Sequence, residues 1–278
     1  MSIRVYNGPH SDRHDGPSPW IRRLPLIFAI ATVLLQIAWP LASGSTRTTL
    51  TIAIVCTFFL SSLSHAWLNR GWGWTLAWAV ISIAFGFVIE LVGTRTGLPF
   101  STYSYQPDTL GWTVSNVPVV IPLAWAMMSY PALLVGRRLA ATGRGAVIVA
   151  AWALASWDLF LDPQMVGEGY WTWESPSPSL PGIPGIPIVN YLGWLLAAAV
   201  LMFLLNRLPD PDWRAPSAPA PRRRTPEAVP GALYLWTWLG GIIANVFFLG
   251  RPAVGIIGGI AMGLVAVPYA LRLTERAP

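Results

Sequence analysis

Eight apolar stretches dominate the sequence and limit what the chain can fold into. A helix of about twenty apolar residues crosses the hydrocarbon core of a bilayer, and helical structure satisfies its backbone hydrogen bonds there. Hydrophobic residues make up 54% of the chain and charged residues 11%, whereas soluble domains carry about 25% charged residues. We therefore expect an all-α, polytopic membrane bundle of about eight transmembrane helices. The expected spans are residues 24–41, 49–68, 73–92, 117–135, 145–161, 188–205, 232–249 and 253–271.

The arginines indicate how these spans are oriented. All eighteen basic residues are arginine, and cytoplasmic segments of membrane proteins carry an excess of basic residues. With the N-terminus inside, fifteen arginines fall in inner segments, and only Arg47, Arg95 and Arg251 fall outside. We therefore expect both termini in the cytoplasm and a multi-pass location in the cell (inner or plasma) membrane. Nucleic-acid binding is not expected, because the arginines lie between apolar stretches and form no interaction face.

One membrane domain accounts for most of the chain. We expect residues 1–20 to be a disordered cytoplasmic segment, residues 21–272 to form the transmembrane domain, and residues 273–278 to be a tail. Within the domain, residues 206–231 are rich in Pro and Arg and predict an irregular cytoplasmic linker. The last two spans are rich in glycine, and small residues allow membrane helices to pack closely.

Cysteine and histidine are too scarce for the usual metal and redox sites. Cys56 is the one cysteine, which excludes an internal disulfide and a thiolate cluster within the chain. Two of the three histidines, His10 and His14, lie in the polar N-terminal segment, which leaves His65 in the domain. A histidine-rich di-iron site cannot be built from this set, so we expect no metal site and no redox metal chemistry.

Two aspartates in the sequence SWDLFLDP are the first candidates for chemistry. Asp158 and Asp162 are four residues apart, so they share a helix face near the end of an apolar span. Two carboxyl groups close together in a poorly solvated place do not both ionise easily, so one is expected to keep its proton at neutral pH and to serve as a general acid. The alternative is a helix end whose acids contact water or the loop backbone.

Glu90 is the third acid at the edge of an apolar span, in FGFVIELVG. With the orientation above, it lies at the same depth as the two aspartates. An ionisable residue at membrane depth is by default a candidate for function. It is either a second acid or base, or the ion-pair partner of Arg95, five residues further along. Arg95 is in turn a candidate for contact with substrate or lipid.

Aromatic residues crowd the two loops that follow these acids. Aromatic faces beside carboxyl groups can stabilise a cation in a dry pocket, but Trp and Tyr are also enriched at membrane interfaces for other reasons. Asn190, at the start of the sixth span, is a candidate for a contact with substrate. The tract SPSPSLPGIPGIP predicts neither helix nor strand, but a lid or crossover loop. The aromatic candidates are Tyr103, Tyr105, Trp112, Trp157, Trp171 and Trp173.

Residues 86–194 carry four motifs that resemble those of one enzyme family. They are ELVGTRTGLPFSTYSY, the run VPVVIPLAWAMMSYP, WDLFLDPQMV with GYWTW after it, and GIPIVNYLGW. In this order they resemble the membrane carotenoid-biosynthesis hydratases, and the resemblance covers about 110 residues of this motif core. It implies an integral membrane enzyme without a cofactor.

The resemblance also implies a reaction and roles for the acids. Water adds across the terminal 1,2 double bond of an acyclic carotenoid end group, by protonation to a tertiary carbocation and capture of water. Asp158 would donate the proton, Asp162 would keep that acid protonated, and Glu90 or Asp162 would deprotonate the water. The aromatic rings would stabilise the cation. The implied partners are a lipid-soluble carotenoid, water, the lipid bilayer and other enzymes of carotenoid biosynthesis.

Three other functions stay open on the sequence. An end-group cyclase protonates the same double bond but loses a proton instead of capturing water, so product mass separates the two. A transporter would use the acids as a proton relay, although they cluster at one depth instead of crossing the bilayer. A scaffold for other carotenoid enzymes would tolerate neutralisation of Asp158.

Overall fold

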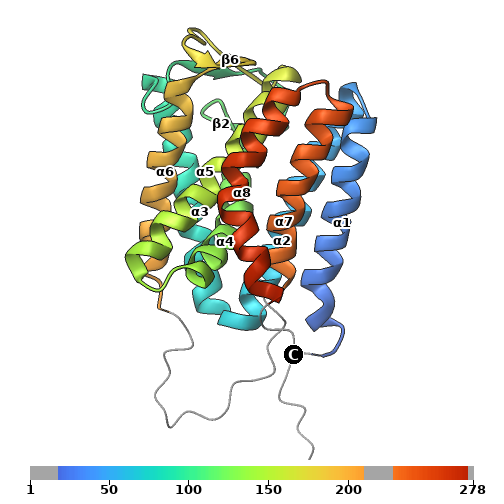
Figure 1. The fold of residues 1–278 in the computed structure, drawn as a ribbon, viewed down its shortest axis with the longest axis vertical. Coiled ribbons are helices and arrows are strands. Elements are labelled where there is room, and N and C mark those ends of the chain that lie inside the picture. Colours follow the sequence, from blue (N-terminus) through green and yellow to red (C-terminus); the bar gives the residue numbers. More distant parts are fainter. Residues whose placement is uncertain (1–17, 210–227, 275–278) are drawn as a thin grey trace, which may run out of the picture.

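The chain forms a bundle of eight long helices (Figure 1). This computed structural model describes residues 18–209 and 228–274. Most of the predicted N-terminal segment, most of the predicted linker and the last four residues lie outside the described residues. The helices are α1 Leu24–Ala38, α2 Gly44–Arg70, α3 Trp72–Thr96, α4 Val120–Leu139, α5 Gly143–Gly167, α6 Ile188–Asn206, α7 Ala228–Ile243 and α8 Pro252–Thr274. Three short helical turns extend two of them: η1 Ile21–Arg23 and η2 Trp39–Leu41 at the two ends of α1, and the π-helix η3 Ala244–Phe248 after α7.

In the described chain, eight helical segments are long and apolar enough to cross a membrane. This confirms the predicted polytopic all-α bundle. The last two helices begin earlier and α8 ends later than predicted: α7 begins at Ala228, inside the predicted linker, and α8 extends to Thr274, inside the predicted tail. The cytoplasmic position of the termini stays a prediction.

Helix α4 is the centre of the bundle. Its apolar window is 83% buried, and it contacts α2, α3, α5, α6, α7 and α8. Close contact with α5 depends on Gly136, where a Cβ atom would lie 2.5 Å from the backbone oxygen of Ala146. Small residues at such crossings let membrane helices approach each other.

The prediction that the two glycine-rich last spans pack tightly is confirmed. Gly255, Gly259 and Gly263 of α8 each face a side chain of α7 or η3, with 2.5–3.3 Å between the position of an added Cβ and the nearest atom. Gly241 of α7 and Gly258 of α8 lie against the ring of Phe160 on α5. The glycines therefore bring these helices onto α5, which carries two of the candidate acids.

A small β layer covers one end of the bundle (Figure 1). Strand β1, Tyr103–Tyr105, pairs antiparallel with β4, Trp171–Trp173, so the two aromatic loops are joined. Strands β2, Thr113–Val114, and β3, Val117–Pro118, form a second pair. The helical spans were predicted without these strands, which are too short for a pattern of alternation.

The Pro/Gly tract corrects one prediction. It was expected to form neither helix nor strand, yet β5, Ser179–Leu180, pairs with β6, Ile183–Pro187, in a hairpin. Gly182 in the turn has φ +74°, a conformation that glycine adopts without strain. Prolines are tolerated in such a two-stranded ribbon because its outer edges need no backbone donor.

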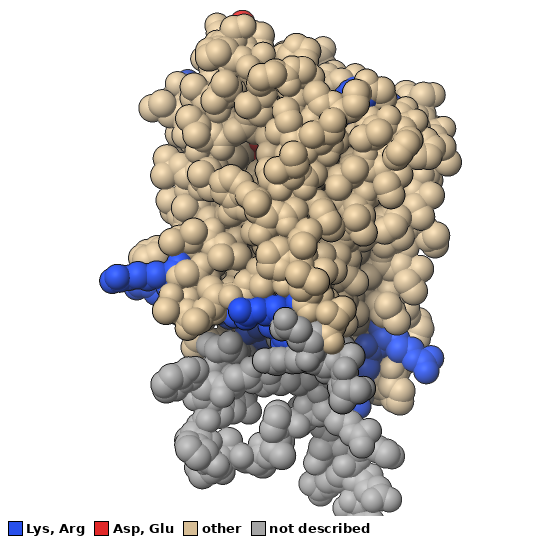
Figure 2. Space-filling model, in the orientation of Figure 1, with Lys and Arg blue, Asp and Glu red and all other residues tan. Residues whose placement is uncertain are grey.

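The surface separates charge from apolar area along the bundle (Figure 2). Arginine side chains gather near the end opposite the β layer, and a few lie at the other end. The broad surface between them carries almost no charge on this face, apart from a spot of acidic surface in a hollow. Such a band is the surface that a bilayer requires.

Gly136→Ala tests the close packing of α4 on α5. The added methyl group would meet backbone, which cannot rotate away, so we expect a loss of about 1–3 kcal/mol in stability. The measurement is thermal unfolding of the purified protein in detergent. Gly73→Ala is the matched control, because nothing lies within 4 Å of its added Cβ, and it should leave the midpoint unchanged or raise it. Equal midpoints for both variants would contradict the packing role of Gly136.

Candidate active site

A cavity of about 360 Å³ lies inside the bundle beneath the β1–β4 pair. Side chains from seven of the eight helices line it, and most of the lining is aromatic or aliphatic. The lining includes two acids, Glu90 and Asp162, and the amide of Asn190. An apolar pocket with a few polar groups is the usual form of a small-molecule site.

Glu90 of α3 is held by three donors. Its side chain is buried, and its Oε2 accepts hydrogen bonds from the hydroxyls of Tyr103 at 2.5 Å and Tyr105 at 2.7 Å. Its Oε1 accepts a hydrogen bond from Nε1 of Trp125 at 2.9 Å. Tyr103 and Tyr105 are two residues apart on β1, so both side chains point from the same face of the strand. All three donors are neutral groups, and their hydrogen bonds compensate for the burial of the carboxyl group.

The two phenols are donors rather than acids in this arrangement. Burial and the nearby charge of Glu90 raise the pKa of Tyr103 well above its ordinary value. The pKa of Tyr105 is raised well above its ordinary value by the same causes. Both hydroxyls therefore keep their protons at any physiological pH and stay available to Glu90.

Asp158 and Asp162 of α5 share one amide group. Nδ2 of Asn190, in the first turn of α6, donates to Oδ2 of Asp162 and, at 3.2 Å, to Oδ2 of Asp158. Nε1 of Trp171 on β4 donates to Oδ1 of Asp162 at 3.2 Å. Both carboxyl groups are buried, and each has an oxygen bonded to the same amide nitrogen. Two buried carboxyl groups this close together favour the state in which one proton is shared between them.

The two aspartates differ in their access to the cavity. Asp162 lines it, whereas Asp158 is fully buried behind it and does not. The sequence analysis gave the role of proton donor to Asp158. The structure places Asp162 where a substrate could touch it, because its side chain is among those that line the cavity and the side chain of Asp158 is not.

Most of the predicted aromatic residues are brought together. The cavity is lined by Tyr103, Tyr105, Trp157, Trp171 and Trp173, together with Asn190.

Two predicted contact residues lie elsewhere. Trp112 is 90% exposed on a loop and Arg95 is exposed near the end of α3, and neither lines the cavity. The alternative ion pair of Glu90 with Arg95 is also not formed. Helix α3 continues to Thr96, so Arg95 projects outward while Glu90 points inward. The described residues instead contain an ion pair between Arg47 and Glu168.

Two tryptophans in the site were not singled out from the sequence. Trp125 of α4 and Trp194 of α6 stack with 4.1 Å between ring centroids and 5° between planes, and both line the cavity. Trp157 meets Trp194 edge to face at 6.3 Å. Both missed residues stand inside the quoted motifs, in LAWAMM and NYLGW, but a tryptophan within an apolar span gives no sign of the face on which it lies.

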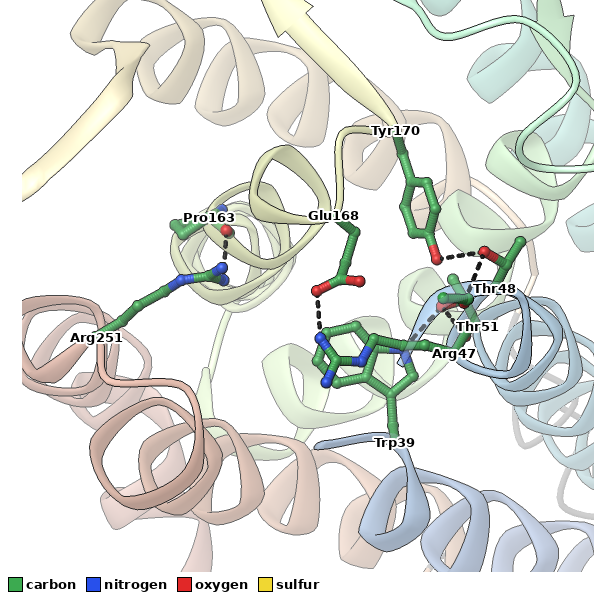
Figure 3. A network of polar contacts seen from close by, with 9 residues as sticks. Trp39, Arg47, Thr48, Thr51, Pro163, Glu168, Tyr170 and Arg251 are labelled. Carbon is green, nitrogen blue, oxygen red and sulfur yellow. Dashed lines mark hydrogen bonds and ion pairs between the residues drawn. The ribbon is translucent and has the colours of Figure 1, made fainter. Parts of the chain in front are cut away.

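A polar network fixes the rim of the cavity (Figure 3). The guanidinium of Arg47 forms an ion pair with Glu168 and lies 4.9 Å from the ring centroid of Trp39, which lines the cavity. Trp39 in turn donates to the hydroxyl of Thr51 at 2.8 Å. The network therefore ties the ends of α1, α2 and α5 together.

Arg251, between η3 and α8, completes this rim. Its Nη1 donates to the backbone oxygen of Pro163 at 2.6 Å, directly after Asp162 (Figure 3). Burial lowers the pKa of Arg251 below its ordinary value, and the nearby charge of Glu168 opposes that effect. Arg47 and Arg251 are two of the three arginines assigned to the outer side, and both have structural partners at the end of α5.

Comparison with known proteins identifies the family of this chain. The chain matches the family of carotenoid biosynthesis proteins over residues 44–269 and belongs to it. The chain is therefore a multi-pass membrane protein of carotenoid biosynthesis.

One relative of the chain is a hydratase. The chain is 33% identical to bisanhydrobacterioruberin hydratase of Haloarcula japonica over 127 residues. The match covers 44% of this chain and 41% of that protein, so it spans about two fifths of the relative's length. No solved structure matches the chain significantly.

The Arg47–Glu168 pair can be tested by a double-mutant cycle. Arg47→Gln and Glu168→Gln should each lower the thermal midpoint in detergent, and the double variant should lose less than the sum. Both side chains are 16% exposed, so we expect a coupling of about 1 kcal/mol. Arg95→Gln and Glu174→Gln, on two exposed residues, form the control pair and should be additive. Additive losses in the Arg47–Glu168 pair would show that its charges do not hold the rim.

Proposed function

We propose that this protein is a carotenoid hydratase, which adds water across the terminal double bond of an acyclic carotenoid end group. The observation that carries the proposal is a pair of buried aspartates, one of which faces an aromatic cavity that also contains a separately held glutamate. Membership of the carotenoid biosynthesis family and similarity to bisanhydrobacterioruberin hydratase support the same reaction. The location in the cell membrane and association with other carotenoid enzymes belong to this proposal.

The first step is protonation of the alkene by Asp162. The proton of its carboxyl group adds to the less substituted carbon of the terminal double bond, and the π electrons form the new C–H bond. The other carbon becomes a tertiary cation, and Asp162 becomes a carboxylate. Asp158 and Asn190 act through Asp162 without touching the substrate. The proton shared with Asp158 keeps Asp162 protonated, and the amide of Asn190 stabilises the negative charge that forms on Asp162.

The cation then requires a dry pocket that does not react with it. The ring faces of Trp125, Trp157 and Trp194 can stabilise a positive charge, since each carries electron density above its plane. These rings are held in place by one another and by the hydrogen bond from Trp125 to Glu90. No covalent bond to the protein is needed at this stage.

Water completes the reaction at Glu90. A water molecule beside the carboxylate attacks the cation through its oxygen and passes one proton to Glu90, which yields the tertiary alcohol. Transfer of that proton back to Asp162 restores the starting state, so the net change is the addition of one water. The steps use only proton transfer and water.

Asp162→Asn should remove the activity. The variant is to be expressed in a lycopene-producing bacterium, and its pigments separated by liquid chromatography with mass detection. The wild type should give a more polar pigment heavier by one water, and Asp162→Asn should reduce it by a factor of roughly 10² or more, the usual contribution of a general acid. Asp158→Asn should reduce the hydrated pigment by a smaller factor, because Asp158 acts through Asp162.

The matched control is Asp108→Asn, an exposed aspartate in a loop outside the cavity, which should keep full activity. A pigment of unchanged mass but altered absorption from the wild type would support the cyclase instead. Full hydration by Asp162→Asn would overturn the assignment of the acid.

Glu90→Gln should change the kind of product as well as the amount. The cation still forms but its capture by water slows, so proton loss competes. We expect the ratio of isomerised pigment, which has the mass of the substrate but a different retention time, to hydrated pigment to rise by about 10²-fold, the lower end of a general-base effect. Glu174→Gln is the control and should keep the wild-type ratio. A loss of all products in the same proportion would argue that Glu90 acts at protonation instead of at water capture.

A further inference from the structure

The exposed part of the cavity wall is confined to two helix ends. Among the lining residues, those with exposed side chains are Ile37 at 48%, Leu41 at 71%, Ile243 at 46% and Phe248 at 55%. The first two belong to α1 and η2, and the other two to α7 and η3. The remaining lining residues are buried or half-buried. The cavity therefore reaches the surface between these two helix ends.

This opening faces lipid. All four exposed residues fall within segments that are long and apolar enough to cross a membrane, Ile21–Leu41 and Ala228–Phe248. All four are also apolar, which is what a surface in contact with hydrocarbon requires. An opening to water would be expected to carry polar residues at its edge.

The two sides of the opening are joined at one point. Nε1 of Trp236 on α7 donates to Oε1 of Gln36 on α1 at 2.8 Å, and both residues line the cavity. The bond holds α1 and α7 at a fixed separation. After Ile243 the chain continues into the π-helix η3, whose turn is wider than that of an α-helix. Such turns are rare in proteins, and where they occur they are often at functional sites.

We propose that this opening is a lateral portal through which the polyene chain of the substrate lies, while its end group occupies the cavity. The proposal rests on the proposed function, which supplies a lipid-soluble substrate. A conjugated chain is stiff and cannot coil up inside a cavity of about 360 Å³. It must leave the cavity in a nearly straight line, and the portal leads directly to the hydrocarbon in which such a molecule dissolves.

The portal makes a prediction about chain length. Ile243→Trp and, from the opposite side, Ile37→Trp should narrow the opening without touching the acids. The full chain in lipid vesicles is given two alkenes with the same end group, a long acyclic carotenoid and a short isoprenoid. The added ring would occupy the space through which the chain leaves, so hydration of the long substrate should fall roughly tenfold, which corresponds to about 1.4 kcal/mol. The short substrate has no long chain that must lie in the portal, so its hydration should stay close to the wild-type rate.

Leu239→Trp is the matched control. Leu239 lies one turn before Ile243 on α7, is equally exposed at 46%, and does not line the cavity. It should leave hydration of both substrates unchanged. The portal would be excluded if Ile243→Trp kept full activity on the long substrate, lost both substrates equally, or behaved like Leu239→Trp.

A second readout separates this proposal from the proposed function. If the wild type hydrated neither alkene, the hydratase would be wrong, and the portal would be judged by the carotenoid that remains bound per protein after purification. Retention by the wild type and by Leu239→Trp but not by Ile243→Trp would support a portal for a carotenoid with another fate. Equal retention by all three, or retention by none, would overturn it.

Discussion

Three carboxyl groups inside a membrane bundle are the constraint on which the rest of this structure depends. A buried charge is unfavourable unless hydrogen bonds or a second charge compensate it, and among the described residues the arginines do not provide that compensation. Neutral donors do so instead: phenols and an indole at Glu90, and an amide and a second indole at Asp162. Because these donors keep their protons, the acids can gain and lose theirs without breaking an ion pair.

The β layer supplies several of the hydrogen-bond donors that the buried acids require. A bundle of apolar helices supplies few polar side chains at this depth, so several of the donors come from the loops. Strand β1 brings both tyrosines to Glu90, and its partner β4 brings Trp171 to Asp162. Pairing of the two strands therefore sets the position of the glutamate's donors relative to those of the aspartates. The rim network around Arg47 and Arg251 fixes the helix ends from which these loops start.

The helical spans and the three candidate acids could be predicted from the sequence. The arrangement of the acids around the cavity could not. Spans of about twenty apolar residues predict helices because few other structures are possible in lipid, and this gave all eight. The i, i+4 spacing brought Asp158 and Asp162 onto one face. Spacing within a helix does not show which residue reaches a cavity, because that depends on the neighbouring helices, so the order of the two aspartates was not predictable.

The same limit explains the other differences. Glu90 and Arg95 are near enough in sequence for an ion pair, but the pair requires α3 to end at about Gly93, and the helix runs on to Thr96. Trp125 and Trp194 come from helices that are distant in the chain, and their stacking is a property of the packed bundle. The β5–β6 hairpin formed in a Pro/Gly tract because a single glycine turn was enough to bring two short strands together.

The central claim is that a buried aspartic acid and water act on a carotenoid double bond in this cavity. The most direct measurement gives purified protein in lipid vesicles an acyclic carotenoid in water labelled with heavy oxygen, and analyses the pigment by mass spectrometry. The account predicts one labelled hydroxyl oxygen at each hydrated end with the wild type, and none with Asp162→Asn. A wild-type product without label, or the same labelled product from Asp162→Asn, would contradict it.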